Sequence, residues 1–425
     1  MLEQIAPESV GLCSRRLERV NAWMDRQVEQ ERLPGLSTLI YRRSGVAFLE
    51  TRGYRDRERG LPVDQDTVFR IYSMTKPVTS VALMMLYEEG RFQLDDPVAL
   101  YIPAFRDMQV MEGTDVDRPR LVPARSLITI RQLLTHTSGL TYGFMHANPV
   151  DALYREHEVD FGRRQEPLED IVARLGRLPL IAHPGSEWNY SVATDVLGHL
   201  VEVLSGEHLE AFFQRRILQP LGMRDTSFTV PQHARERFAA MYGPLDGPGL
   251  SGVNAVRPAD ALPPSRPGGL RRLESPEDSP FLRPADACSG GGGLVGTVGD
   301  YLSFCRMLLS GGELEGQRLL GPRTVQFMTR NHLGGDMASM GQPRFSEATF
   351  EGVGFGLGFS VTLDPVRAQL IGSAGEYAWG GAASTAFWVD PSEEMIVILM
   401  TQLMPSSTYP LRRELRALSY QSLID

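Results

Sequence analysis

Strand-forming segments near both ends of the 425-residue chain place the strongest constraint on its fold. Residues 37–41 and 46–54 are rich in β-branched and aromatic side chains and are joined by a short Arg-Arg-Ser-Gly turn. The pattern returns at residues 385–389 and 395–401, joined by the turn-forming sequence Asp-Pro-Ser-Glu-Glu. Helical periodicity dominates the chain between these two pairs. We therefore predict one antiparallel sheet, built from both ends of the chain and interrupted by a helical unit.

Further segments complete this α/β architecture, which is of the α+β type. Amphipathic helices at residues 14–31 and 411–423 are expected to flank the sheet, and residues 356–363 and 369–375 to form additional strands. Other helices are predicted at residues 78–89, 130–134, 169–177, 193–204, 209–218 and 300–309.

The pattern divides the chain into two domains. Residues 1–72 and 290–425 form a discontinuous α/β domain, and residues 73–289 form a mainly helical one. Nine prolines and six glycines fall within residues 243–284, where no periodicity is seen. Loops of this length in a compact protein are usually functional or mobile. We interpret this one as a rim or flap over a site between the domains.

Charge and targeting signals exclude several classes of partner. The 52 acidic side chains outnumber the 43 basic ones and give a net charge of −9, which repels nucleic acid and anionic membranes. No apolar run approaches the roughly 20 residues that cross a bilayer. The first residues carry an acidic side chain where a signal peptide carries positive charge. We expect a cytoplasmic protein with a small-molecule substrate and no nucleic acid or membrane partner.

The cysteines and histidines give no sign of a metal centre. Cys13, Cys288 and Cys305 are odd in number and far apart, which is typical of reduced thiols. The eight histidines form no His-Glu-x-x-His or similar cluster. We therefore expect no metal and no cofactor.

The basic residues are divided unevenly between the two types. Forty-two are arginines and only one, Lys76, is a lysine. A desolvated lysine can lose its proton near neutral pH, whereas an arginine cannot. Lys76 is therefore a candidate for a role that needs an uncharged amine, provided that its surroundings support one.

The surroundings of Lys76 do support such a role. Ser73 precedes it by three residues, and residues three apart on a helix share a face, so the amine can reach the serine hydroxyl. Pro77 is tolerated only in the first helical turn, so the helix begins close to Ser73. Its continuation, residues 78–89, is apolar on nearly all sides and hence buried. The arrangement predicts a serine nucleophile with a lysine base near a positive helix end; the alternative is an ordinary helix cap beside a solvated lysine.

Other hydrolase signatures are missing from the sequence. No serine sits in Gly-x-Ser-x-Gly, the nucleophile elbow of α/β-hydrolases. His136, within residues 134–140, is interpreted as a structural histidine at a helix end. A Ser-His-Asp triad is therefore disfavoured.

Seven short motifs carry a family resemblance. They are Ser73-Met-Thr-Lys76, residues 133–140, Pro184-Gly185, Tyr190-Ser-Val192, Pro220-Leu-Gly-Met223, residues 290–294 and Trp379-Gly-Gly381, in that order. Together they resemble the family VIII carboxylesterases, serine hydrolases with the fold of class C β-lactamases and penicillin-binding D-peptidases. The resemblance spans about residues 5–420 and implies that fold.

The resemblance also implies roles for individual residues. Ser73 matches the nucleophile and Lys76 the adjacent base. Tyr190 matches the first residue of a Tyr-x-Asn box, whose phenol transfers the proton between the serine and the leaving group; a merely buried tyrosine is the alternative. The backbone N–H groups of Ser73 and Ala382 match the two oxyanion donors.

The wall of the expected site departs from the β-lactamase pattern. The resemblance places Trp379, Gly380 and Gly381 where β-lactamases carry Lys-Thr-Gly, and Val192 where the box has asparagine. β-Lactamases use that lysine for the substrate carboxylate and that asparagine for an amide side chain. We expect an apolar wall that suits a neutral ester, with Tyr142 as a further substrate-binding residue. A tryptophan packed in the core is the alternative for Trp379.

These residues predict a serine carboxylesterase that hydrolyses short-chain esters through an acyl-serine intermediate, with weak β-lactam hydrolysis as a side activity. A class C-like β-lactamase, a D-aminopeptidase or D-peptidase, and an acyltransferase would use the same side chains and stay open as alternatives. A ligand-binding sensor with a silent site is the alternative from another functional class.

Overall fold

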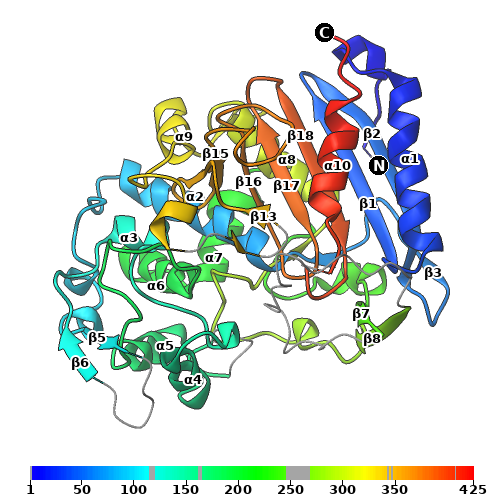
Figure 1. The fold of residues 1–425 in the computed structure, drawn as a ribbon. Coiled ribbons are helices and arrows are strands. Elements are labelled where there is room, and N and C mark those ends of the chain that lie inside the picture. Colours follow the sequence, from blue (N-terminus) through cyan, green and yellow to red (C-terminus); the bar gives the residue numbers. More distant parts are fainter. Residues whose placement is uncertain are drawn as a thin grey trace.

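The computed structural model contains an eight-stranded antiparallel sheet. The structure describes residues 2–113, 120–160, 165–245, 269–341, 344–345, 348–406 and 408–425. The strand order is β14-β15-β16-β17-β18-β1-β2-β3 (Figure 1). β18, near the C-terminus, pairs with β1, near the N-terminus, with Ile398 opposite Leu39. The prediction of one sheet built from both ends of the chain is therefore confirmed. The strands are β1 (Gly35–Arg42), β2 (Gly45–Asp56), β3 (Leu61–Pro62), β14 (Val353–Phe355), β15 (Ser360–Thr362), β16 (Tyr377–Gly380), β17 (Ala386–Asp390) and β18 (Met395–Thr401).

Helices cover both faces of this sheet, so its middle strands are apolar on both sides. The covering helices are α1 (Ser14–Glu29) and α10 (Leu411–Tyr420) on one face and α2 (Thr75–Glu88) and α8 (Val298–Leu309) on the other. Successive side chains of a strand point to opposite faces. Val397 accordingly packs in the layer with α1 and α10, whereas Ile398 packs in the layer with α2 and α8. This double burial explains the continuous apolar run of β18.

The middle of the chain is helical, as its periodicity predicts. Its helices are α3 (Ile130–Leu134), α4 (Pro149–Glu156), α5 (Leu168–Leu175), α6 (Ala193–Ser205) and α7 (Leu209–Phe213), which continues as a π-helix over Gln214–Leu218. Every residue of α2 from Thr75 to Leu86 is buried, which confirms the prediction from its apolar pattern. Thr129 caps α3 by accepting a hydrogen bond from the backbone N–H of Gln132. The two-domain division stays a prediction.

Small elements connect these layers. They are β4 (Phe69–Arg70) with β9 (Val295–Gly296), β5 (Gln109–Glu112) with β6 (Arg120–Pro123), β7 (Met241–Pro244) with β8 (Leu270–Glu274), β10 (Glu313–Leu314) with β11 (Gln317–Arg318), β12 (Arg344–Phe345) with β13 (Ala348–Thr349), and helix α9 (Pro322–Met328).

The strand predicted at residues 369–375 is wrong. Gln369 has a φ of +54° and Gly375 a φ of +91°, both in the left-handed region, which an extended strand does not use. The segment forms turns instead, and the strand begins at Tyr377, so that the strand-forming residues lie a few positions later than predicted.

The long segment at residues 243–284 is not wholly irregular. Residues 246–268 lie outside the described residues, but its described ends pair as β7 and β8. Glu274 at the end of β8, and Pro280 and Phe281 beyond it, line a cavity that also contains Ser73. This end of the segment therefore lies at the rim of a site.

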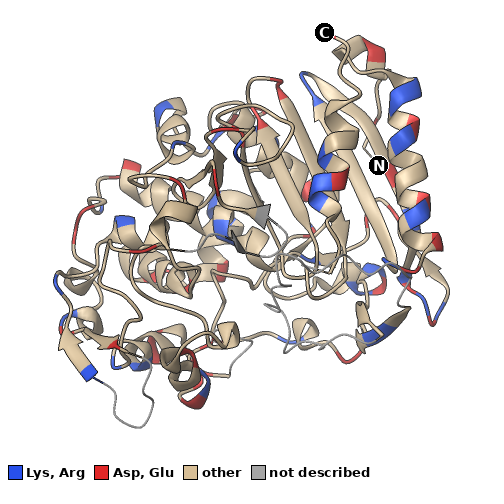
Figure 2. Cartoon of the chain, viewed as in Figure 1, with Lys and Arg blue, Asp and Glu red and all other residues tan. Residues whose placement is uncertain are grey.

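The surface of the molecule carries charges of both signs. Blue and red segments alternate along α1 and α10, whereas the middle strands are largely uncharged on the face shown (Figure 2). In the described part of the chain, we find no helix with the length and apolar character needed to span a bilayer.

Removing side-chain atoms from the sheet core tests this packing. Ile398 is completely buried between β1, β17 and the α8 layer. Ile398→Ala should lower the free energy of unfolding by about 2–5 kcal/mol, because it removes apolar contacts and leaves a cavity. Denaturant titration measures the change. Leu100→Ala is the control, since Leu100 is 67% exposed and its truncation should change the free energy by less than about 0.5 kcal/mol. Equal effects of the two substitutions would contradict the packing described.

Candidate active site

The backbone that leads to Ser73 is anchored by a buried arginine. The Arg70 side chain in β4 is fully buried, forms an ion pair with Glu274 and donates a 3.0 Å hydrogen bond to Ser279 Oγ. Tyr72 follows with a φ of +42°, a left-handed conformation that is strained for a side chain of this size. The chain therefore reaches Ser73 through a strained and firmly anchored turn.

The amine of Lys76 is buried against the Ser73 hydroxyl. A 3-10 helix over Tyr72–Met74 leads directly into α2, whose first turn carries Lys76 with 2% of the residue exposed. Its Nζ donates to Ser73 Oγ at 3.3 Å, Tyr142 OH at 3.0 Å and Gly291 O at 2.7 Å. Three oxygens from separate segments thus surround one amine. The solvated lysine considered as an alternative is therefore wrong.

Tyr190 brings a phenol to the same hydroxyl. Its OH donates a 2.6 Å hydrogen bond to Ser73 Oγ, and Lys76 Nζ lies 4.6 Å from the centroid of its ring. The residue is 4% exposed and lies just before α6. Ser73 Oγ therefore has an amine and a phenol as its two neighbours, at distances that suit proton transfer.

The ring of a histidine, His136, packs against the ring of Tyr190. The ring of His136 lies 5.1 Å from that of Tyr190, and its Nδ1 lies 3.2 Å from Ser191 Oγ. Burial, and then the positive charge of Lys76, lower the pKa of His136 well below its usual value. His136 follows α3 directly and makes no contact with Ser73 among the described hydrogen bonds, which agrees with the predicted structural role.

Tyr142 is part of the lysine environment and of a cavity wall. Its hydroxyl accepts from Lys76, and its ring stacks on Phe144 with 4.5 Å between the centroids. Burial, and then the nearby Asp195 carboxylate, raise the pKa of Tyr142 well above its usual value. The phenol therefore stays protonated.

The turn between β16 and β17 carries Ala382 toward the nucleophile. Gly381 N donates a 2.8 Å hydrogen bond to Thr385 O and closes the turn. A Cβ at position 381 would collide with the Thr385 hydroxyl and lie 2.5 Å from Ile71 O, so only glycine fits. Across the part of the chain that is described, the backbone N–H of Ala382 has no hydrogen-bond acceptor, and Ala382 lines the same cavities as Ser73. This N–H is therefore available to an oxyanion.

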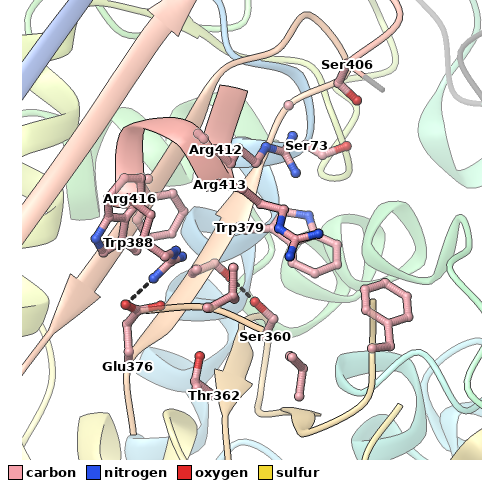
Figure 3. Close-up of a pocket in the computed structure, with 18 of the residues that line it drawn as sticks. Ser73, Ser360, Thr362, Glu376, Trp379, Trp388, Ser406, Arg412, Arg413 and Arg416 are labelled. Carbon is pink, nitrogen blue, oxygen red and sulfur yellow. Dashed lines mark hydrogen bonds and ion pairs between the residues drawn. The ribbon is translucent and has the colours of Figure 1, made fainter. Parts of the chain in front are cut away.

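Two cavities meet at the nucleophile. One has a volume of about 480 Å³ and the other about 140 Å³, and Ser73, Phe144 and Ala382 line both. The larger is also lined by Tyr142, Asp195, Phe228, Phe281 and Cys288. The smaller is also lined by Tyr190, Phe350, Val353, Leu370 and Trp379 (Figure 3). The groups on the two sides of a carbonyl at Ser73 can therefore occupy separate spaces.

Trp379 forms part of the smaller cavity and is not simply a core residue. It is half-buried in β16, with its ring 5.6 Å from the ring of Tyr190 and 5.3 Å from that of Phe355. Gly380 and Gly381 continue the same wall. The structure thus brings the predicted Trp-Gly-Gly segment to the nucleophile.

The wall is less apolar than the sequence predicts. Arg412, Arg413 and Arg416 extend from α10 toward the smaller cavity (Figure 3). Arg416 forms an ion pair with the buried carboxylate of Glu376, and a Cβ at Gly380 would collide with the Arg412 guanidinium. The expected apolar wall with few polar anchors is thus accompanied by cations from α10, which no local motif reveals.

Val192 does not take the predicted substrate-binding position. It is the N-cap of α6 and is completely buried, and it lines neither of the two cavities. Its backbone N–H donates to Thr141 O at 3.2 Å. The correction has a simple cause: the helix begins here and turns this side chain into the core.

Two groups at the site are not predicted from the sequence. Asp195, on the first turn of α6, is buried beside the glycine-rich turn at residues 289–293, and Gly291 supplies an acceptor to Lys76. The glycines are visible as a motif, but their contact with Lys76 joins residues 215 positions apart. Only the five-residue distance from Tyr190 to Asp195 is a local signal, and it is weak.

His208, Glu210 and Cys288 form a cluster that sequence spacing does not indicate. Their ligand atoms lie within 4.8 Å of one another, in the described part of the chain. His208 is exposed, and none of the three contacts Ser73, Lys76 or Tyr190 in the hydrogen bonds described. We assign the cluster no role in the chemistry at Ser73.

Comparison with known proteins agrees with this geometry. The Beta-lactamase family model matches residues 20–421. The chain is 33% identical over 387 residues to esterase EstB of Burkholderia gladioli, covering 90% of this chain and 89% of EstB. It is 29% identical over 356 residues to monacolin J acid methylbutanoyltransferase of Aspergillus terreus, covering 81% and 79% of the two chains.

A solved structure supports the same assignment. EstCE1, described as a hydrolase with promiscuous acyltransferase activity, matches with a TM-score of 0.78 and 28% identity, over 96% of this chain and 99% of that one. The predicted fold of β-lactamases and penicillin-binding proteins is thus confirmed. The chain belongs to the Beta-lactamase family of serine hydrolases.

Proposed function

We propose that the protein is a family VIII carboxylesterase that hydrolyses short-chain esters through an acyl-serine intermediate. The observation that carries the proposal is the arrangement at Ser73 Oγ, with Tyr190 OH at 2.6 Å and Lys76 Nζ at 3.3 Å. An amine and a phenol at these distances can accept the serine proton as the oxygen attacks a carbonyl.

In the proposed mechanism Ser73 Oγ forms a bond to the ester carbonyl carbon. Its proton passes to the Tyr190–Lys76 pair, in which the amine is uncharged at the start. The backbone N–H groups of Ser73 and Ala382 hold the oxyanion that develops. Tyr190 then protonates the departing alcohol as the carbon–oxygen bond to it breaks. Water attacks the acyl-serine in the same way and releases the acid.

The shape of the site favours an ester with two unequal parts. The smaller cavity, about 140 Å³, suits a short acyl group, and the larger, about 480 Å³, is in the size range of ligand pockets. Their linings are mainly aromatic and aliphatic beside the arginines of α10. Such surfaces bind neutral ester groups by burying apolar area.

Acyl transfer to an alcohol is the second candidate. The acyl-serine would be the same, and an alcohol in the larger cavity would replace water as the second nucleophile. Two relatives point this way, since one is named a methylbutanoyltransferase and the other a hydrolase with promiscuous acyltransferase activity. The size of the larger cavity gives such an acceptor room.

A substrate panel tests the proposal. Nitrophenyl acetate and butyrate should be hydrolysed faster than a chromogenic cephalosporin or a D-amino acid amide. Butyrate hydrolysis in the presence of an added alcohol separates the two candidates, because transfer yields a new ester and hydrolysis yields only butyric acid. Preference for the cephalosporin would indicate a β-lactamase, and preference for the amide a D-aminopeptidase. Turnover of none of them would favour a binding protein.

Substitution of the base gives the sharpest mutational test. Lys76→Arg keeps a cation but removes a group that can become uncharged. We expect kcat for nitrophenyl butyrate to fall by about 10²–10⁴-fold, the usual contribution of a positioned acid–base group. Tyr190→Phe should lose activity within the same range. Retention of most esterase activity in Lys76→Arg would show that the base is assigned wrongly.

Substitution of the turn glycine tests the oxyanion donor. Gly381→Ala places a Cβ against Ile71 O and the Thr385 hydroxyl and so moves the N–H of Ala382. Loss of one such donor typically lowers kcat by about 10²–10³-fold, and we expect a decrease of at least tenfold with little change in KM. Gly334→Ala is the matched control, because a Cβ there meets nothing within 4 Å. Unchanged kcat in folded Gly381→Ala would remove Ala382 from the mechanism.

A further inference from the structure

The glycine-rich turn at residues 289–293 is clamped between two helices of the site. Gly290 O accepts a 2.7 Å hydrogen bond from Thr79 Oγ1 of α2. On the other side, a Cβ at Gly290 would lie 2.8 Å from the backbone oxygen of Thr194 in α6, and a Cβ at Gly291 would lie 2.5 Å from Asp195 Oδ2. The turn therefore needs glycine to pass between the helices.

Asp195 fixes the orientation of this turn. The residue is 1% exposed, and its Oδ1 accepts from Ser289 Oγ at 2.5 Å and from Gly291 N at 3.0 Å. With Thr79 on the carbonyl side, both polar groups of the peptide between residues 290 and 291 are paired. The next carbonyl, that of Gly291, then points at Lys76 Nζ, 2.7 Å away.

The described hydrogen bonds connect the carboxylate to the amine only through this backbone, and the two groups also interact through their charges. Within the residues that the structure describes, no ion pair of 4.0 Å or less joins Asp195 and Lys76. Asp195 contacts the turn, the turn contacts Lys76, and Lys76 contacts Ser73 Oγ at 3.3 Å. A change at Asp195 therefore acts on the base through the position of one carbonyl oxygen, in addition to any loss of a nearby negative charge.

From this chain of contacts we infer that Asp195 is a positioning residue for the acyl-transfer reaction, whose ionised carboxylate holds the turn at residues 289–293 so that Gly291 O keeps the Lys76 amine on Ser73. The inference rests on the proposed acyl transfer at Ser73. Asp195 touches neither Ser73 nor Tyr190 in the hydrogen bonds described. Its role is the placement of the base.

Protonation of Asp195 should therefore lower activity. Burial raises its pKa to about 6, opposed by Lys76 and by the hydrogen bonds from Ser289 and Gly291, whereas Asp160 raises it further. The charged and titratable groups around it are Lys76 from α2, Asp160, and the phenol of Tyr142. A protonated carboxyl is a weaker acceptor for two donors than a carboxylate.

The stability effect has the opposite sign. Because the pKa is higher in the folded state than the ordinary 3.8, the folded protein binds more protons between about pH 4 and 6. Asp195 therefore stabilises the fold increasingly as the pH falls through this window. Loss of activity there cannot be caused by unfolding driven by this group, so the two effects can be measured separately.

The experiment follows the phosphonylation rate of Ser73 by a fluorophosphonate between pH 4.5 and 8.5. This rate reports nucleophile activation whichever ester the enzyme prefers. We expect the wild type to lose reactivity below a midpoint near pH 6. In Asp195→Asn the rate at pH 8 should fall by about 10- to 100-fold, the range for a misplaced catalytic group, and the step near pH 6 should disappear.

Ser289→Ala gives a second prediction, which specifies the direction in which the pH profile shifts. The Ser289 hydrogen bond lowers the Asp195 pKa. Its removal should therefore move the fall in phosphonylation rate at low pH (the acid limb of the profile) to higher pH. A residue with a merely structural role would not displace the limb. This variant keeps both the Asp195 carboxylate and the Gly291 contact, and so tests the inference even if Asp195→Asn folds poorly.

Asp300→Asn is the matched control. Asp300 also lies in a first helical turn, also accepts from one backbone N–H and one hydroxyl, and has its pKa raised to about 6 by burial. Its partners, Asp225 and Thr226, line neither cavity at Ser73. The rate and pH profile of this variant should match the wild type.

The outcomes separate this inference from the proposed function. A wild-type rate and an unchanged limb in folded Asp195→Asn would overturn the positioning role, as would an unmoved limb in Ser289→Ala. Failure to hydrolyse any ester, with Ser73 still phosphonylated and the limb displaced as predicted, would reject the esterase and keep Asp195. No labelling of wild-type Ser73 would reject both.

Discussion

The amine of Lys76 is removed from water at the centre of the molecule, and each of its donors must find an acceptor there. The acceptors are Ser73 Oγ, Tyr142 OH and Gly291 O, from three segments that are distant along the chain. Satisfying this one group therefore brings helix α2, an aromatic wall and a glycine-rich turn into contact. The same contacts bring together the proposed nucleophile and its proposed base, so the polar network that makes the burial tolerable is also the arrangement on which the proposed chemistry depends.

The sheet supplies the other half of the site. β16 ends in a turn whose Gly381 lies against the backbone of Ile71, two residues before Ser73. That close approach ties Ala382 to the segment of Ser73, which the buried Arg70 also anchors. The proton-transfer groups therefore come from α2 and from the segment just before α6, and the oxyanion donor at Ala382 comes from the turn after β16. A carbonyl bound between them meets both sets at once, which is what an acyl-transfer site requires.

The sequence predicts those features that depend on short spacings. The three-residue step from Ser73 to Lys76, the proline after it and the β-branched run at residues 395–401 each report a local geometry, and each prediction agrees with the structure. The strand expected at residues 369–375 fails because residues there adopt left-handed backbone conformations that composition does not reveal. The Asp195–Gly291 contact and the approach of α10 to the smaller cavity join positions far apart in the chain, and no periodicity encodes them.

The single lysine among 43 basic residues now has a physical explanation. Two buried arginines among the described residues pair with carboxylates, Arg70 with Glu274 and Arg416 with Glu376. The guanidinium suits those positions because it has several donors in a fixed plane and never loses its charge. At position 76 the partners are a hydroxyl, a phenol and a carbonyl, with no carboxylate in direct contact among the described residues. The proposed mechanism needs a basic residue that can give up its proton there, and of the two residue types only lysine can do so.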